Sequence, residues 1–135
     1  LLKNWQTSID LSQQVFDILL PDNIGVLNCQ QSRVNSDAIG IILPKDNQKV
    51  TLRFNHNNPV CLPNFRHKSR QLKKVLQELN IPTWQRKRIA FLYYDDELVA
   101  AINHFICQPF VVKATTENKV GGNEQCLIFT LKNEA

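Results

Sequence analysis

The chain has 135 residues, of which 43% are hydrophobic and 21% charged, a composition typical of a globular domain that buries a core. Sixteen Lys and Arg residues against twelve Asp and Glu residues give a net charge of +4. No apolar run approaches the ~20 residues of a membrane-spanning helix, so we expect one domain, or one domain with a remnant of its neighbour, and no membrane association.

The first 20 residues do not predict a single kind of element. Leu11, Val15 and Ile18 are spaced as on a helix, whereas the alternation before residue 9 is typical of a strand. We interpret residues 1–20 as a leading segment or linker remnant from a preceding domain, and residues 21–135 as the domain itself. The chain contains no methionine, and a natural reading frame starts with one, so we expect a fragment of a longer protein.

From residue 24 the hydrophobic period changes to two, which predicts strands. We expect strands at 24–29, 38–43 and 49–54, a polar loop at 30–37, a turn at 44–48 and another loop at 55–64. In the third strand Val50, Leu52 and Phe54 share one face, so Arg53 points to the other.

Residues 65–88 predict the principal helix. Leu72, Val75, Leu76 and Leu79 fall at i, i+3, i+4 and i+7 and form one buried stripe. Ser69 is the expected N-cap. At the other end, Asn80 is expected to stop the helix in a left-handed conformation, and Pro82 prevents its resumption.

The rest of the chain predicts further strands. Residues 89–94 and 98–107 form an expected hairpin around Asp95-Asp96-Glu97, followed by a strand at 110–115, a flexible loop at 117–125 and a last strand at 126–131. Several strands with one principal basic amphipathic helix define an α+β fold, a compact sheet-rich domain.

The positive charge is concentrated on one segment. Residues 65–88 hold eight Lys and Arg residues and a single acid, Glu78, so the net charge is +7 there and −3 elsewhere. A solvated helix face normally mixes signs, because like charges at i and i+4, such as Arg70 and Lys74, repel each other. A one-sign segment is what phosphate binding requires. A merely solvated basic face is the simpler alternative.

No residue pattern predicts catalysis or a metal site. Asp95-Asp96-Glu97 is typical of a solvated turn, and His104 lies in an apolar run where packing is more frequent than ligation. A thiol–imidazole pair would need Cys61 or Cys107 beside His56 or His67, yet no nucleophile motif flanks either cysteine. Gly121-Gly122 is followed by no helix pattern and predicts a turn, not a phosphate loop.

The four cysteines contain no C-x-x-C pair. Their spacing fits neither a zinc site nor a compact disulfide framework. We expect reduced thiols used as small core residues, as in a cytoplasmic protein.

Three separate runs, 50–54, 70–86 and 92–100, resemble one family in order and spacing. This family is the C-terminal domain of bacterial tRNA(Ile)-lysidine synthetase, and the resemblance covers about residues 20–109. Two mild departures are Asn80, where glycine is expected, and Thr83, where a second proline is expected. Asn tolerates the left-handed conformation and Thr can cap a turn, so neither departure conflicts with the fold.

The resemblance implies a sheet-rich module related to a domain of bacterial phenylalanyl-tRNA synthetase. It implies that a separate catalytic N-terminal domain uses ATP, with magnesium, to activate the wobble cytidine of an isoleucine tRNA, which lysine then modifies. The present sequence lacks the family's Ser-Gly-Gly-X-Asp-Ser loop. We therefore expect no cofactor and no catalysis in this chain alone.

The implied role of this chain is to hold the tRNA acceptor stem through phosphates and 2′-hydroxyls, since side chains cannot read the narrow RNA major groove. The expected contacts are Arg66, Arg70, Lys73, Lys74, Arg86 and Arg88, and the weaker candidates are Arg53, His67, Lys68 and Lys87. Trp84 could stack on a base, but between Pro82 and Ile89 it is expected to fill the core. The alternative function is a basic module that docks on another domain or subunit, although interface centres are usually poor in lysine. A stand-alone enzyme has no supporting residues.

Overall fold

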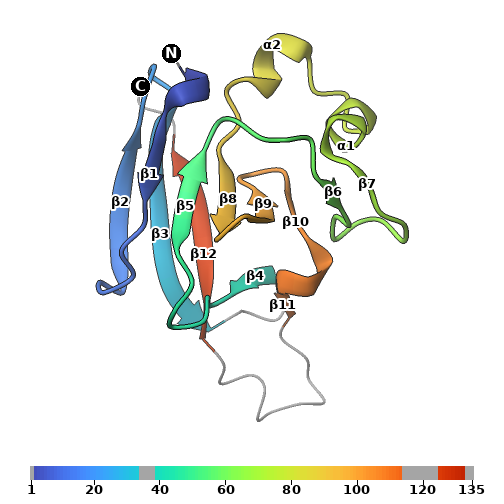
Figure 1. The fold of residues 1–135 in the computed structure, drawn as a ribbon. Helices are drawn as coiled ribbons and strands as arrows, with labels where there is room; N and C mark the ends of the chain where they lie inside the picture. Colours follow the sequence, from blue (N-terminus) through green and yellow to red (C-terminus); the bar gives the residue numbers. More distant parts are fainter. Residues whose placement is uncertain (1, 34–38, 114–124, 133–135) are drawn as a thin grey trace.

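Two five-stranded antiparallel sheets form most of the computed structural model, which describes residues 2–33, 39–113 and 125–132 (Figure 1). The first sheet has the order β1-β5-β8-β9-β10. Its strands are β1 (Gln6–Ser8), β5 (Val50–Arg53), β8 (Phe91–Tyr94), β9 (Glu97–Ala101) and β10 (Phe105–Ile106).

The second sheet has the order β11-β4-β12-β3-β2. Its strands are β11 (Val111–Lys113), β4 (Ile39–Ile42), β12 (Gln125–Lys132), β3 (Gly25–Arg33) and β2 (Val15–Leu20). A two-stranded ribbon joins β6 (Val60–Cys61) to β7 (Arg70–Gln71), and the helical segments are η1 (Leu2–Asn4), α1 (Leu72–Glu78), α2 (Thr83–Arg86) and η2 (Gln108–Phe110).

The molecule has three layers, and strand β8 shows why. All four of its residues are buried, although a half-exposed strand would alternate. Leu92 and Tyr94 pack in the core between the two sheets. Phe91 and Tyr93 point to the opposite face and pack under α1 in a second core. The first sheet is therefore covered on one face by the second sheet and on the other by α1.

A hydroxyl group on buried strand β8 connects the two sheets. The Tyr94 hydroxyl donates to the carbonyl of Ile42 at 2.6 Å, which ties the first sheet to the second. Burial raises the pKa of this phenol, so it stays neutral.

Several predictions from the sequence are confirmed. The structure is an α+β fold, Val50, Leu52 and Phe54 share the inter-sheet core, and β8 and β9 form the expected hairpin. Cys29, Cys61, Cys107 and Cys126 are all buried, as expected for core residues.

Other boundaries are wrong. Residues 30–33 belong to β3 and not to a loop, because β12 pairs with all four of them and β2 pairs with Gln30. These main-chain partners cannot be predicted from the polar side chains of the segment. The predicted strand 98–107 is broken by a turn in which Asn103 has φ of 71°. Phe110 belongs to η2, and the loop 55–64 contains β6. The predicted loop at 117–125 lies outside the described residues except for its last residue, which begins β12.

The leading segment forms strands and no α-helix in its described part. Strand β1 pairs with β5, and β2 pairs with β3. In β2 the side chains of Phe16, Ile18 and Leu20 turn inward while Val15 and Leu19 stay exposed, so the period is two. Residues 6–8 and 15–20 therefore supply one strand to each sheet, and the domain boundary at residue 20 stays a prediction.

The longest helix in the described part of the chain is α1, with seven residues. A helix needs ~20 apolar residues to cross a bilayer, and none of the described helices is long and apolar enough to do so.

Candidate nucleic-acid interface

Helix α1 lies in the middle of the basic segment, residues 65–88. Groups outside the helix form hydrogen bonds with the backbone at both of its ends. Leu72, Val75 and Leu76 are buried and Leu79 is half-buried, which confirms the predicted stripe. Ser69 is not the cap, because the chain first forms β7 and the helix begins only at Leu72. The acceptor at this end is the Asn58 side chain, whose Oδ1 accepts from the backbone N–H of Lys73 at 2.8 Å. Asn58 thereby satisfies one of the free donors at the helix start.

The C-terminal end of α1 is closed by a Schellman motif. The N–H of Ile81 donates to the carbonyl of Leu76 at 3.2 Å, and the N–H of Asn80 donates to the carbonyl of Gln77 at 3.0 Å. Asn80 has φ of 59°, which confirms the expected left-handed conformation. Ile81 and Leu76 are buried in the same core, so the chain turns sharply toward α2.

Glu78 holds two of the expected contact residues. The Arg66 guanidinium pairs with one of its carboxylate oxygens, and Arg70 Nε lies 3.1 Å from the other. These two arginines share a single negative charge, so Arg66, Arg70 and Glu78 together keep only one net positive charge.

Two further arginines are fixed by the fold around α2. Arg88 donates to the carboxylate of Asp22 at 2.8 Å and to the Asp22 carbonyl at 2.9 Å. Arg86 donates through Nε to the carbonyl of Ile81 at 2.7 Å. The Arg86 side chain is therefore held in one place while its charge is balanced by no acid in the described part of the chain.

The lysines of the segment are exposed, and none of Lys68, Lys73, Lys74 and Lys87 forms an ion pair within the described residues. Lys73 and Lys74 point in different directions, because consecutive residues on an α-helix lie about 100° apart. Lys73 faces the groove described next, whereas Lys74 does not line it.

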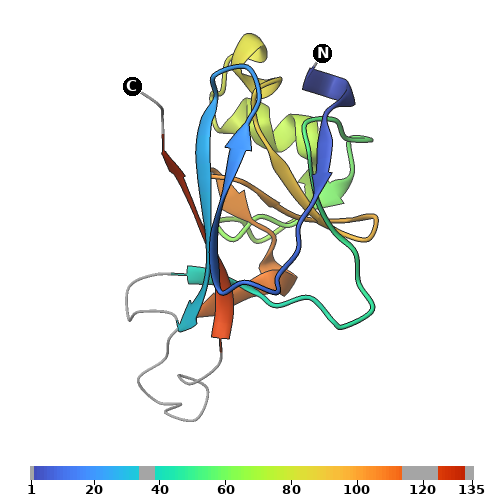
Figure 2. The ribbon, with the colours of Figure 1, turned by 90° about the vertical axis from the view of Figure 1, so that its left-hand side faces the viewer.

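A groove of about 760 Å³ runs between α1, α2 and the N-terminal segment, and we call it the basic groove. Both ribbon views place η1 at the same end of the molecule as α2 (Figures 1 and 2). The cationic side chains lining the basic groove are Lys3, Lys73, Arg86 and Lys87, and its floor includes Phe54 and Leu76. Asp22, the one acid among the described residues that line it, is already paired with Arg88. The groove therefore presents four cations to whatever enters it.

His56 lies in the wall of this groove. Its Nδ1 accepts from the backbone N–H of Asn58 at 2.9 Å, and its ring meets Phe91 edge-on at 5.2 Å. Burial, and then the nearby Lys73 ammonium, lower the pKa of His56. The imidazole is thus held neutral as an acceptor, which keeps Asn58 in position to cap α1.

The structure brings together only part of the predicted set. Lys73, Arg86 and Lys87 meet in the basic groove, whereas Arg66 and Arg70 are paired with Glu78 and Arg88 is paired with Asp22. His67 and Lys68 are exposed in the segment before β7. Lys3 and His56 were missed, because neither belongs to the charged segment and only the fold brings them to it.

The prediction that Trp84 fills the core is wrong. Its side chain is 69% exposed on α2, and no α2 residue is buried. The core position next to it is taken by Ile81 and Ile89, which pack on either side of the short α2 turn. An exposed indole beside cationic residues offers a surface on which a base can stack.

Arg53 is held on the opposite face of β5, as expected, but it is not free. Its guanidinium carbon lies 4.1 Å from the centre of the Tyr93 ring. It also donates to Thr51 Oγ1 at 3.0 Å and to the carbonyl of Asp95 at 2.8 Å. Asp95 has φ of 54° and accepts from the N–H of Lys49, so Asp95 and Asp96 form the turn between β8 and β9, and Glu97 begins β9.

The remaining polar candidates have packing roles. The thiols of Cys61 and Cys107 hydrogen-bond each other, which lowers the pKa of Cys61 and raises that of Cys107. Burial lowers the pKa of His104. In the described part of the chain, no group of three or more His, Cys, Asp or Glu side chains could hold a metal ion.

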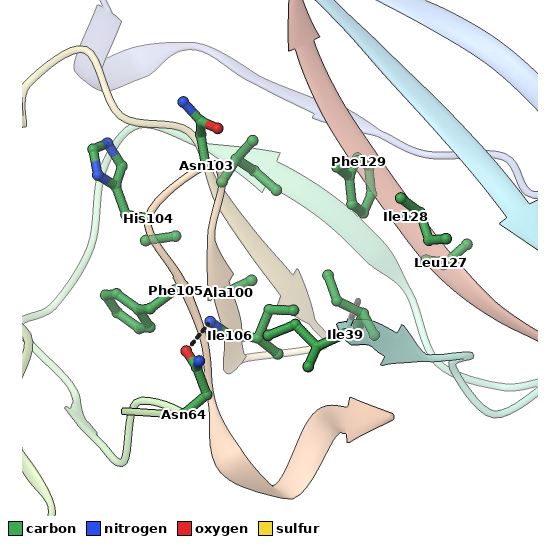
Figure 3. Close-up of a pocket in the computed structure, with 13 residues that line it drawn as sticks. Ile39, Asn64, Ala100, Asn103, His104, Phe105, Ile106, Leu127, Ile128 and Phe129 are labelled. Atoms are coloured by element: carbon green, nitrogen blue, oxygen red, sulfur yellow. Dashed lines mark hydrogen bonds between the residues drawn. The ribbon is translucent and has the colours of Figure 1, made fainter. Parts of the chain in front are cut away.

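A cavity of about 240 Å³ lies between the two sheets, away from the charged segment. Figure 3 shows it lined by apolar side chains such as Ile106 and Leu127, with the Asn64 amide oxygen accepting from the N–H of Ile106 at 3.2 Å. Among the described residues that line it there is no Lys or Arg, so this cavity carries no part of the phosphate-binding argument.

Fold and site together define an α+β domain of two sheets whose one principal helix borders a cationic groove. The chain belongs to the family described as the TilS substrate C-terminal domain, whose model matches residues 50–120, just over half of the sequence. The resemblance seen in the sequence is thereby confirmed.

Curated relatives agree with this family. The chain is 35% identical over 94 residues to tRNA(Ile)-lysidine synthase of Coxiella burnetii, covering 70% of this chain and 20% of that protein. It is 39% identical over 101 residues to the synthase of Serratia proteamaculans, with 74% and 22% covered, and 35% identical over 106 residues to that of Vibrio campbellii, with 78% and 22% covered. The chain spans about a fifth of the length of the curated relatives it matches.

Proposed function

We propose that this domain binds tRNA(Ile) for a tRNA(Ile)-lysidine synthase, by holding the phosphates of the acceptor stem. The relatives that it matches carry that name, and the chain corresponds to about a fifth of their length. The chemistry, with ATP, magnesium and lysine, belongs in this proposal to a catalytic domain outside the present sequence.

The observation that carries the proposal is the basic groove. Four cations line it, and its one acid is neutralised by Arg88. Phosphates enter such a groove favourably because each one that is neutralised releases condensed counterions. The groove has a volume of about 760 Å³, which is larger than a single small ion requires.

Other basic residues of the segment extend the proposed contact surface. They are Lys74, Arg66, Arg70 and Arg88, and the three arginines already pair with acids of the fold. We therefore expect them to contribute less per residue than Lys73 and Lys87. Arg86 belongs with the stronger group, because its side chain is fixed without losing its charge.

The decisive experiment measures tRNA binding over a salt series with the double variant Lys73→Ala/Lys87→Ala. Two lost phosphate contacts should weaken binding to different tRNA sequences alike and flatten the slope of log K against log salt by about 1.4–1.8. The matched control is Lys45→Ala/Lys49→Ala, which removes the same charge at the opposite end of β5, where both side chains are exposed. The control should keep most of the slope.

Equal slopes for both double variants would mean that only net charge matters and would overturn the assignment of the groove. Unchanged binding by Lys73→Ala/Lys87→Ala would favour the alternative, in which the basic face docks on another domain or subunit. Both variants replace exposed side chains, so thermal unfolding should confirm that each remains folded.

A further inference from the structure

A second cleft, of about 630 Å³, continues from the basic groove. The two share Lys3, Asn55 and His56 in their walls. Beyond these shared residues the lining changes from cations to carboxamides and aromatic rings. We call it the carboxamide cleft, and its distinguishing residues are Asn4, Trp5, Gln6, Arg53, Asn57 and Tyr93.

The charge of the carboxamide cleft differs from that of the basic groove. Among the described residues its Lys and Arg side chains are Lys3, at the shared wall, and Arg53, which stacks on Tyr93 and lies 3.9 Å from the exposed carboxylate of Asp96. A carboxylate at this position disfavours phosphate. The arrangement thus separates a region suited to phosphates from a region suited to neutral polar groups.

The polar groups of the cleft suit a nucleobase. Carboxamides offer a donor and an acceptor side by side, the pattern that pairs with base edges. Gln6 lies directly opposite Arg53 across the β1–β5 pair, so the two side chains share one face of the sheet. The Oδ1 of Asn55 accepts from the N–H of His56 at 2.9 Å, which fixes the orientation of that amide.

The flat groups of the cleft are held rigidly. Trp5 is half-buried, with its ring 5.3 Å from that of Phe54. The Arg53 guanidinium is held by Tyr93, Thr51 and the Asp95 carbonyl, yet 26% of its side chain remains accessible. A planar group fixed before binding loses little entropy when a base stacks on it, and both indole and guanidinium planes serve this purpose in RNA recognition.

We propose that the carboxamide cleft binds an unpaired ribonucleotide base at the end of a stem whose phosphates lie in the basic groove. This proposal rests on the proposed function, since it requires that the groove holds an RNA strand. A tRNA acceptor stem ends in an unpaired 3′ extension. The bases of this extension would lie next to the basic groove, where the carboxamide cleft could bind one of them.

The test compares three RNA hairpins with one stem sequence: a blunt stem, a stem with a four-nucleotide 3′ overhang, and a stem with an abasic overhang of the same length. The abasic overhang keeps the phosphates and lacks the bases. The wild-type chain should bind the base-bearing overhang about tenfold more tightly than the abasic one, as expected for a stacked and hydrogen-bonded base.

The variant Gln6→Ala/Asn57→Ala should lose most of that tenfold difference while its salt slope stays that of the wild type. Both side chains are exposed, and unfolding curves will show whether the fold is kept. The control Asn47→Ala removes an exposed carboxamide in the turn before β5 and should keep the full difference.

Equal binding of base-bearing and abasic overhangs by the wild type would overturn the cleft proposal, and salt-dependent binding of the blunt stem would then leave the proposed function standing. A tenfold difference that survives in Gln6→Ala/Asn57→Ala would place the base elsewhere and also overturn it. Absence of salt-dependent binding to every stem would refute the proposed function itself, and the cleft proposal with it.

Discussion

Replacing Asn58 by alanine should lower the free energy of unfolding by about 2 kcal/mol, although this residue belongs to no helix or strand. Asn58 makes two contributions. Its Oδ1 caps α1 by accepting from the N–H of Lys73 at 2.8 Å, and loss of such a cap costs about 1 kcal/mol. Its backbone has φ of 52°, a conformation that asparagine tolerates and that costs alanine about 1 kcal/mol more.

Two further substitutions separate these contributions. Asn58→Asp keeps an acceptor oxygen and tolerates the left-handed conformation, so its stability should lie within about 0.5 kcal/mol of the wild type. Asn58→Gly removes the cap but accepts the backbone angle, so it should lose about 1 kcal/mol.

The measurement is thermal or urea unfolding of the four proteins at one pH. For a chain of 135 residues, a loss of about 2 kcal/mol corresponds to a fall in Tm of about 7 °C. A glycine variant as stable as the wild type would refute the cap. Alanine and glycine variants of equal stability would instead show that the backbone angle contributes nothing.

Two other predictions concern the core and the pH dependence of stability. Leu76→Ala should lower the free energy of unfolding by about 2–5 kcal/mol, because Leu76 is 1% exposed. Lys73→Ala on the same helix should change it by only about 0.5 kcal/mol. Thermal shifts in the reverse order would contradict the packing of α1. His56 has a folded-state pKa below its ordinary value of 6.5, so the unfolded state takes up the proton first. The contribution of neutral His56 to the free energy of unfolding is fully present above pH 6.5, and it is lost as the pH falls through the folded-state pKa. The stability advantage of the wild type over His56→Gln should therefore shrink between pH 8 and pH 5, and an advantage that stays constant would rule out this titration.

Local features of the fold could be predicted from sequence. The α1 stripe, the left-handed Asn80 and the alternation of β5 each depend on neighbouring residues, and the structure confirms all three. The cap of α1 could not be predicted in this way. Ser69 has suitable chemistry, but its place is taken by Asn58, which reaches the helix from 15 positions before Lys73 along the chain.

The candidate site was predictable in composition and not in geometry. A count of charges finds the basic segment, but it cannot show that Glu78 binds two arginines or that Arg88 meets Asp22 from 66 positions away. Lys3 joins the groove only because the N-terminal segment pairs with β5. Long-range contacts of this kind leave no periodic signal in the sequence.

Strand order in the second sheet bears on how the molecule is assembled during synthesis. The last described strand along the chain, β12, lies between β3 and β4, and it pairs with β3 from Val26 to Arg33. Until residues 125–132 leave the ribosome, β3 and β4 lack the strand that joins them, so the sheet cannot close while the chain is growing. Sheets completed by such distant pairings fold slowly and expose unpaired edges in the meantime. The core between the first sheet and α1 uses no residue beyond Phe110, so this half can become ordered first and then serve as the surface on which the other sheet is completed.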